Sequence, residues 1–273
     1  EKMSLKSSIG WATKTWNPVT GCSPISEACE NCYARRFAYR LKGRFGYPKD
    51  DPFRVTIHYD RFHYPLHWKK KKVFVVSMGD LFHDEVSDLV LDELFAIMAH
   101  PKASSNVFLI LTKRIKRAKE YINSIPPNIW FGITAENQKR ADERIPILLK
   151  IPAKLRFVSI EPILGSMPYL FRYFYKHICP DCGYELNSHA ERIKDCKQNW
   201  VCPRCGSPYC EEHEPRMLDW IIIGAETGPG KREPKKEWIE SAIDQAKWAN
   251  IPIFMKDNLK PYWGGGLIQE WPE

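Results

Sequence analysis

The 273-residue sequence has no long uninterrupted apolar run. A membrane-spanning helix needs about 20 mostly apolar residues, and no segment approaches that length. The first residues, EKMSLKSSIGW, lack the apolar core of a secretion signal. We therefore expect a cytoplasmic protein with no membrane partner.

Internal repeats, low-complexity tails and long linkers are also absent from the sequence. No GxGxxG fingerprint follows the first predicted strand, which argues against a doubly wound sheet that binds a dinucleotide. The hydrophobic content of 44% is ordinary for a globular protein. A chain of this length can bury the core of one large α/β domain, with or without a small insert.

Acidic residues are the scarcer charged class, with 33 Asp and Glu against 41 Lys and Arg and a net charge of +8. This balance is compatible with a polyanionic partner such as DNA or RNA. The densest basic run, KKKK at 69–72, we interpret as a solvated loop before a strand. The many Trp and Tyr rings could stack on bases, but we expect most of them to fill the core.

Short apolar runs alternate along the chain with helix-like segments of about ten residues or more. Together with a first strand near 14–20, they predict about seven strands, the others at 73–80, 107–114, 129–136, 155–162, 220–228 and 251–257. Near-continuous apolar strands separated by helices are typical of a parallel sheet covered by helices. We predict a partial (β/α) barrel, with an open flavodoxin-like sheet as the alternative.

Polar residues follow these runs at similar positions. Each one alone is more often a helix cap or a loop ion pair than a ligand. In a parallel sheet, however, all of them would lie at the carboxyl ends of the strands, where α/β barrels place active sites. The residues concerned are Gly79, Asp80, Lys113, Arg114, Thr134, Glu136, Glu161, Glu226, Lys256 and Asp257.

Nine cysteines fall into two clusters, and without a secretion signal they favour metal binding over disulfides. The first cluster, TGCSPISEACENCYARR, contains Cys22, Cys29 and Cys32. Structural zinc requires four ligands, and no further Cys or His occurs before His58. Catalytic zinc accepts three protein ligands and water, whereas a cubane iron-sulfur cluster with three thiolates leaves one iron open for a cofactor. Reduced structural thiols or an incomplete zinc site remain the alternative.

An ordered set of motifs spans nearly the whole chain: TWNPVTGCSPISEACENCYARR, SMGDLFHD, LTKR, ADERIPILL, SIEPILG, IIIGAETGPGKR and IPIFMK. With these motifs the chain resembles the phage- and prokaryote-associated three-Cys-motif proteins, a group similar to a branch of the radical S-adenosylmethionine (SAM) superfamily. The resemblance excludes only residues 168–217, approximately. It implies a partial barrel in which Cys22, Cys29 and Cys32 hold a [4Fe-4S] cluster and SAM chelates its fourth iron.

By position, the resemblance also implies roles for other residues. Reduction of the cluster would cleave SAM to methionine and a 5′-deoxyadenosyl radical, which abstracts hydrogen from a substrate. The segment after the second strand corresponds to the place that binds the methionyl amino group, and later strand ends correspond to places near the ribose. The implied cofactor-binding residues are Ser77, Gly79, Asp80, Thr134, Glu136, Ser159 and Glu161, and the candidate substrate contacts are Lys113, Arg114, Glu226 and Lys256.

This chain differs from the usual superfamily pattern at two places. Its cysteines are separated by six and two residues rather than three and two, and Asn31 occupies the usual aromatic position before the last cysteine. The segment after the second strand reads Met-Gly-Asp rather than Gly-Gly-Glu.

The second cysteine cluster interrupts the alternation of strands and helices. Cys179-x2-Cys182 and Cys202-x2-Cys205 form two CPxCG knuckles, a signature of a four-thiolate zinc ribbon. An auxiliary iron-sulfur cluster is the competing interpretation, and we assign no second site to Cys196, Cys210, His189 or His213. The ribbon could bind nucleic acid or simply staple the segment. We predict a barrel at 1–167 and 218–273 with a zinc-ribbon-like insert at 168–217.

These observations lead to one principal hypothesis and two rivals. The principal one is a radical SAM enzyme with a [4Fe-4S] cluster, SAM and Zn2+ that modifies or repairs a nucleic-acid base. The first rival is radical chemistry on a peptide or small molecule, with a separately encoded partner protein as a possible requirement. The second is a non-enzymatic, zinc-dependent nucleic-acid-binding protein.

Overall fold

The structure is a computed structural model that describes residues 9–174 and 217–272. Between them it describes short pieces at 177–178, 181, 185–186, 193–194, 200–201 and 204–207. Within these residues no helix has both the length and the apolar character needed to cross a membrane.

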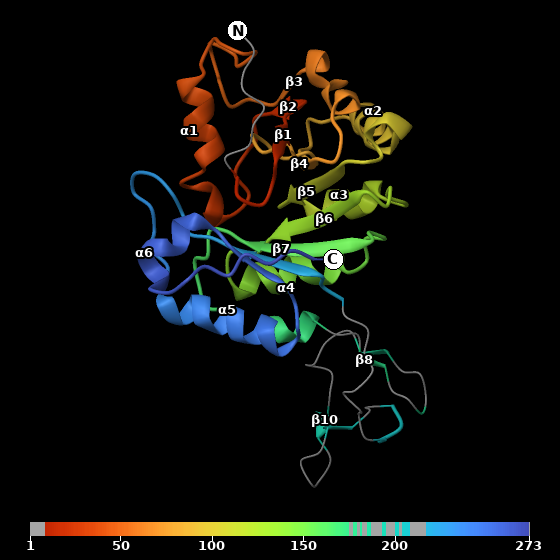
Figure 1. The fold of residues 1–273 in the computed structure, drawn as a ribbon, viewed down its shortest axis with the longest axis vertical. Helices are drawn as coiled ribbons and strands as arrows, with labels where there is room; N and C mark the ends of the chain where they lie inside the picture. The colour runs from red at the N-terminus through yellow and green to blue at the C-terminus, as the bar shows by residue number, and fades with distance from the viewer. Residues whose placement is uncertain are drawn as a thin grey trace.

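The main sheet is parallel throughout and its strands follow one another in chain order (Figure 1). Its strands are β1 (Lys14–Trp16), β4 (Lys72–Val75), β5 (Val107–Thr112), β6 (Ile129–Thr134), β7 (Leu155–Ile160), β12 (Trp220–Ile223) and β13 (Ile253–Met255). The sheet curls into a half-barrel, as predicted from the alternation of strands and helices. Sequential strand order differs from the flavodoxin order, in which the second strand lies outside the first.

The helices are α1 (Tyr33–Arg40), α2 (Asp88–Ala99), α3 (Ile115–Tyr121), α4 (Gln138–Leu148), α5 (Lys236–Trp248) and α6 (Lys260–Trp263). Four of the helices, α2 to α5, connect strands of the sheet as crossovers, whereas α1 precedes β4 and α6 follows β13. Strands β2 (Val19–Thr20) and β3 (Thr56–Ile57) form an antiparallel pair of their own. The cysteine loop and α1 lie between β2 and β3 in the chain.

Side chains alternate strictly between the two faces of the sheet. On β6, Phe131 and Ile133 belong to the core packed against the helices, whereas Trp130 packs in a second core on the concave face. The concave core is mainly aromatic and includes Trp11, Phe157 and Trp220. This second core closes the amino end of the half-barrel. It does not fill the carboxyl end.

The sequence explains where two of the crossover helices begin. Ser87 precedes α2 and its side chain accepts a hydrogen bond from the Val90 amide, and Asn137 caps α4 through the Arg140 amide. Such caps satisfy amides that have no partner within the helix. In α2 the apolar residues Leu91, Leu94 and Met98 recur at helical spacing and are fully buried.

The predicted insert lies largely outside the described residues. Two short antiparallel pairs are described there, β8 (His177–Ile178) with β9 (Glu185–Leu186) and β10 (Ile193–Lys194) with β11 (Trp200–Val201). Of the predicted zinc ligands, only Cys205 is described, and it is exposed, while Cys179, Cys182 and Cys202 lie outside the described residues. The zinc site therefore remains a prediction.

Candidate functional site

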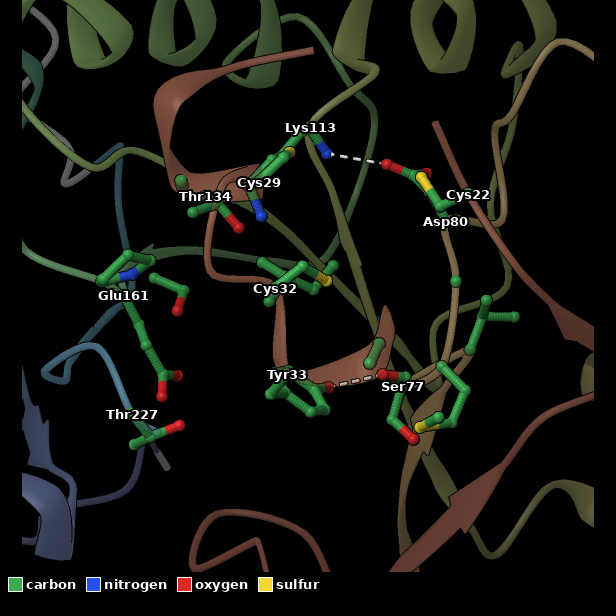
Figure 2. A pocket seen from close by; sticks show the side chains of 18 of the residues that line it. Cys22, Cys29, Cys32, Tyr33, Ser77, Asp80, Lys113, Thr134, Glu161 and Thr227 are labelled. Carbon is green, nitrogen blue, oxygen red and sulfur yellow. Dashed lines mark hydrogen bonds between the residues drawn. The ribbon is translucent and has the colours of Figure 1, made fainter. Parts of the chain in front are cut away.

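A cavity of about 500 Å³ opens at the carboxyl ends of the parallel strands (Figure 2). It contains most of the site residues predicted from the sequence, although they come from segments distant in the chain. Those that line it are Cys22, Cys29, Cys32, Ser77, Gly79, Asp80, Lys113, Thr134, Ser159, Glu161, Glu226 and Lys256. Glu136 and Arg114 do not line it. The structure thus brings the three cysteines to the place where an α/β barrel carries its active site.

Two glycines bring the cysteine loop against the end of β4. The Gly21 amide donates to the Met78 carbonyl at 2.9 Å, and Gly21 and Gly79 form a parallel bridge. Gly21 has φ +87°, and a Cβ there would lie 2.0 Å from the Arg54 carbonyl oxygen. Only glycine fits this position, because the backbone is left-handed and the neighbouring chain leaves no room for a side chain.

The three thiols share the cavity, but they differ in their surroundings. Burial raises the pKa of the Cys22 thiol to about 12, and the Asp80 carboxylate adds to the rise while Arg114 opposes it. Cys29 lies 3.9 Å from the Ser26 hydroxyl, measured between Sγ and Oγ. Across the described residues, no three His, Cys, Asp or Glu side chains are gathered as in a formed metal site. The loop therefore places three thiols at the cavity without gathering them as in a formed metal site.

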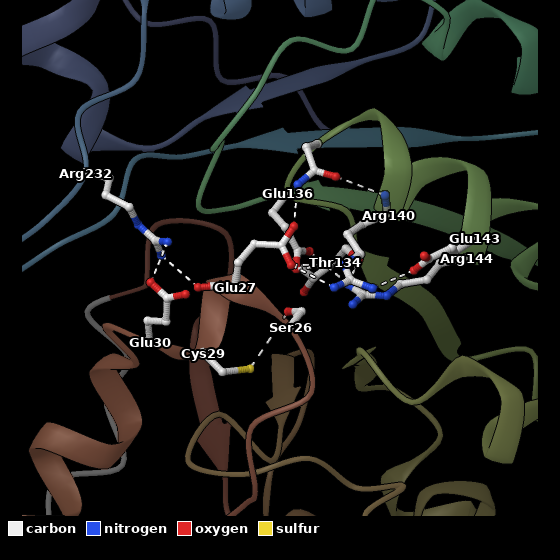
Figure 3. A network of polar contacts seen from close by, with 11 residues as sticks. Ser26, Glu27, Cys29, Glu30, Thr134, Glu136, Arg140, Glu143, Arg144 and Arg232 are labelled. Carbon is white, nitrogen blue, oxygen red and sulfur yellow. Dashed lines mark hydrogen bonds and ion pairs between the residues drawn. The ribbon is translucent and has the colours of Figure 1, made fainter.

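Glu27, in the middle of the cysteine loop, is held by α4 (Figure 3). Its carboxylate accepts from Arg140 at 2.8 Å and from Asn137 at 2.6 Å. The hydrogen bond from Arg140 is the main reason that the pKa of Glu27 falls to about 2. The loop is therefore fixed to the helix that follows β6.

A second arginine, Arg232, holds the same loop from the segment after β12 (Figure 3). Its guanidinium donates to the Glu27 carbonyl at 2.8 Å and to Glu30 Oε2 at 2.9 Å. It also contacts Glu226 Oε1 at 2.6 Å, and Glu226 in turn accepts from Asn31 at 2.9 Å. Burial opposes ionisation of Glu226, but hydrogen bonds from Arg232 and Asn31 keep its pKa below the usual range. Glu226, a predicted substrate contact, thus also fixes the cysteine loop.

Asp80 and Glu136 both have their carboxylates engaged within the protein. Asp80 accepts from Thr112 Oγ1 at 2.7 Å and from the Lys113 amide at 3.1 Å, which joins the ends of β4 and β5. Glu136 is fully buried, and its Oε2 lies 2.9 Å from Arg144 of α4. Of these two predicted cofactor-binding residues, Asp80 faces the cavity and Glu136 lies behind its wall.

The far wall of the cavity combines an ion pair with an unpartnered hydroxyl. Lys256 after β13 pairs with Glu161 after β7, and Gly224 between them leaves room because a Cβ would lie 2.9 Å from Glu161 Cδ. Ser159 is fully buried, and its Oγ has no hydrogen-bond partner in the described part of the chain. Trp11 Nε1, also at the cavity, lacks one among the same residues. Both groups are available to a bound molecule, since a buried polar atom otherwise loses its hydrogen bond to water.

Sequence reasoning did not identify Arg140, Arg232 or Trp11 as part of the site. Glu27 and Arg140 are separated by 113 residues, and no local pattern connects them. Of these three residues, only Arg232 could have been identified from the sequence, because it is the last residue of the motif IIIGAETGPGKR, which also contains Glu226.

Comparison with known proteins gives a family without an assigned activity. No curated protein and no solved structure matches the chain. A family model described as a protein of unknown function, DUF5131, matches residues 6–265, which include both the half-barrel and the predicted insert. The family description mentions neither SAM nor phage. The chain is thus a member of the DUF5131 family.

Proposed function

We propose that the protein is a radical SAM enzyme that acts on a nucleic-acid base. The observation that supports the first half is the convergence of Cys22, Cys29 and Cys32 on one cavity at the carboxyl end of a half-barrel. Cys22 and Cys32 also pack against a small apolar cluster that contains Phe53, but packing alone does not explain why all three thiols line one cavity. The resemblance of the chain's motifs to the three-Cys-motif proteins points in the same direction.

The residues of the cavity fit a cluster in their chemistry. Three thiols supply the soft ligands that iron-sulfur clusters take, and the described residues nearby add no fourth cysteine. The cavity also leaves space for a small molecule beside the loop. A [4Fe-4S] cluster held by these cysteines would supply one electron for cleavage of SAM to methionine and a 5′-deoxyadenosyl radical.

The other residues of the cavity divide into binding and positioning roles. Ser77, Gly79, Thr134, Ser159 and Glu161 face the cavity and would bind SAM. Asp80 and Glu136 keep strand ends and α4 in place, and so would act on the cofactor through the backbone they fix. Lys113 and Lys256 line the cavity and would contact the substrate, whereas Arg114 contacts Ser23 and Asp84 at the edge of the cysteine loop.

Charge supports the nucleic-acid half of the proposal. The net charge of +8 favours a polyanion, because each phosphate contact releases counterions. A zinc ribbon at Cys179, Cys182, Cys202 and Cys205 would add a module of a kind that often binds nucleic acid. A peptide or small-molecule substrate would leave this charge without a role.

The test uses anaerobically reconstituted protein, with iron, sulfide and zinc measured before dithionite is added with SAM. We expect about four irons per chain, one zinc and formation of 5′-deoxyadenosine. Cys29→Ala should remove iron and SAM cleavage but keep zinc, and Cys205→Ala should remove zinc but keep iron. Zinc at both cysteine clusters with no SAM cleavage would overturn the enzyme assignment.

A further inference from the structure

Helix α1, directly after the cysteine loop, exposes an unusual number of aromatic side chains. Phe37 is 49% exposed, Tyr39 is 56% exposed and Tyr33 is 41% exposed. With Ile25 of the cysteine loop, they make up half of the large exposed hydrophobic side chains in the described residues. Soluble proteins usually scatter such side chains, so a cluster of them on one helix indicates a contact surface.

The same helix and the loop after it are strongly basic. No Asp or Glu occurs between Glu30 and Asp50, whereas this stretch contains Arg35, Arg36, Arg40, Lys42, Arg44 and Lys49. Six basic residues in this stretch are a large share of the excess positive charge of the chain. A stretch of basic residues with no intervening acidic residue therefore follows the cysteine loop.

Arg40 and Arg44 differ from several arginines elsewhere in the structure in having no acidic partner among the described residues. Arg117, Arg140 and Arg144 all pair with carboxylates. For Arg40 and Arg44, by contrast, the described residues offer none within ion-pair distance, and Arg44 donates to the Arg40 carbonyl. The Arg40 guanidinium lies 5.4 Å from the Phe37 ring centroid. A positive charge beside an exposed ring is the combination that binds a phosphate and stacks on the adjoining base.

The surface is continuous with the candidate active site. Tyr33 and Phe37 line the mouth of the cavity, and Ile25 lines it from the cysteine loop. Arg36 fixes α1 to the opposite rim, because its Nη2 donates to the Thr227 carbonyl and its guanidinium lies over Gly228. Gly228 has φ +97°, and a Cβ there would lie 1.4 Å from Arg36 Nη1. In Figure 1, α1 stands well apart from α4 and α5.

We propose that the exposed surface formed by Phe37 and Arg40 of α1 with Arg44 of the loop after it binds single-stranded nucleic acid. One base stacks on Phe37 at the rim of the cavity, and the flanking phosphates lie along the arginines. A single strand fits better than a duplex, because stacking on an exposed ring requires an unpaired base. The inference rests on the proposed function for its connection to the active site, but binding itself requires no SAM chemistry.

The test measures fluorescence anisotropy of a labelled oligothymidylate of about twelve nucleotides, a length in the range that single-strand-binding sites cover. Phe37→Ala should weaken binding roughly 5- to 150-fold, the range found when a stacking ring is removed. Arg40→Gln with Arg44→Gln should weaken it further at low salt. The slope of log K against log salt should then become shallower by about 1.4, since each phosphate contact contributes about 0.7 for a single strand.

Matched controls come from α5, on the opposite side of the molecule. Trp248→Ala removes a ring that is 58% exposed, and Lys247→Gln removes an exposed charge, so neither should change oligonucleotide binding. Thermal unfolding should be nearly the same in all of these variants, because the residues lie on the surface. Phe37→Leu, which keeps an apolar side chain but removes the stacking ring, provides a second test of the same face if Phe37→Ala folds poorly.

The outcomes separate this inference from the proposed function. Binding that is absent, indifferent to salt or equally affected by the α5 variants would overturn the α1 surface, even if the protein cleaves SAM. Loss of binding in the α1 variants with no SAM cleavage in the unmodified protein would support the surface and overturn the radical chemistry. If α1 variants bind the oligonucleotide normally but lose a copurifying protein, the surface belongs to a protein partner and the inference is wrong.

Discussion

The two faces of the parallel sheet use alternate residues of the same strands for different purposes. The convex face packs Phe108, Phe131 and Ile133 against the crossover helices in one continuous core. The concave face packs aromatic rings at its amino end and opens into the cavity at its carboxyl end. The comparison teaches that the helix-covered face stabilises the fold, while the other face is left free to build a site. Substitutions at Phe131, Arg144, His58 and Gly132 give four predictions in order of decreasing effect, of which the first and the last compare the two faces directly.

Phe131→Ala should destabilise the protein far more than Leu111→Ala. Phe131 is fully buried on the convex face, where loss of a Phe side chain costs about 3 to 5 kcal/mol. Leu111 is partly exposed to the cavity on the concave face, and we expect a loss below about 2 kcal/mol. Urea unfolding of the two variants measures the difference. Equal losses would contradict the division between the faces.

Arg144→Met should be nearly as damaging as Phe131→Ala, because it leaves the buried Glu136 carboxylate without its close partner. Removal of one member of a buried ion pair costs about 3 to 5 kcal/mol. Arg140→Met, in the same helix but partly exposed, should cost only about 1 kcal/mol. Adding Glu136→Gln to Arg144→Met should restore part of the free energy of unfolding. No recovery would mean that packing, rather than charge, explains the loss.

His58, beside the small β2–β3 pair, should make stability depend on pH. Burial, with a contribution from the Arg61 charge, lowers the pKa of His58 to about 4, and its Nε2 lies 2.8 Å from Thr20 Oγ1. Between pH 6.5 and about 4 the unfolded chain binds the proton more readily, so the free energy of unfolding falls as pH falls. The loss should be on the order of 3 kcal/mol across that window. It should be smaller in His58→Gln, and identical pH profiles for both proteins would contradict the assignment.

Gly132→Ala, on the concave face, should lower the free energy of unfolding least among these four substitutions. An added Cβ would lie 2.5 Å from a ring carbon of Phe157, so the ring must move. Overpacking of this kind costs about 1 to 3 kcal/mol, although alanine is otherwise better than glycine in a strand. Phe157→Leu in the same chain should relieve part of the clash, as thermal unfolding would show. A stable single variant would mean that the concave core yields easily.

Much of the fold could be predicted from the chain because its signals are local. Apolar runs such as 107–114 and 129–136 are buried on both sides, and only a parallel sheet with helical crossovers covers them in that way. Parallel pairing then placed Thr134 opposite Ser159 at the same edge. The sequence could therefore predict that the site residues lie together, because residues that follow parallel strands meet at one end of the sheet.

The role of each carboxylate was beyond local reasoning. Asp80, Glu136 and Glu226 look alike in sequence, each one following an apolar run. In the structure Glu136 is fully buried against Arg144, while Asp80 and Glu226 face the cavity with their oxygens already engaged. Their partners come from other segments of the chain, so sequence spacing cannot predict which side chain will pair with each carboxylate.

By itself, the sequence determined that the chain forms a parallel α/β sheet with three cysteines at its carboxyl edge. Periodic burial and strand direction are properties of each segment, so they can be read one segment at a time. Tertiary structure alone decided that Arg140 and Arg232 hold the cysteine loop, and that the rings of Tyr33 and Phe37 on α1 border the cavity. These are contacts between segments up to 205 residues apart, and the curl of the sheet brings them together.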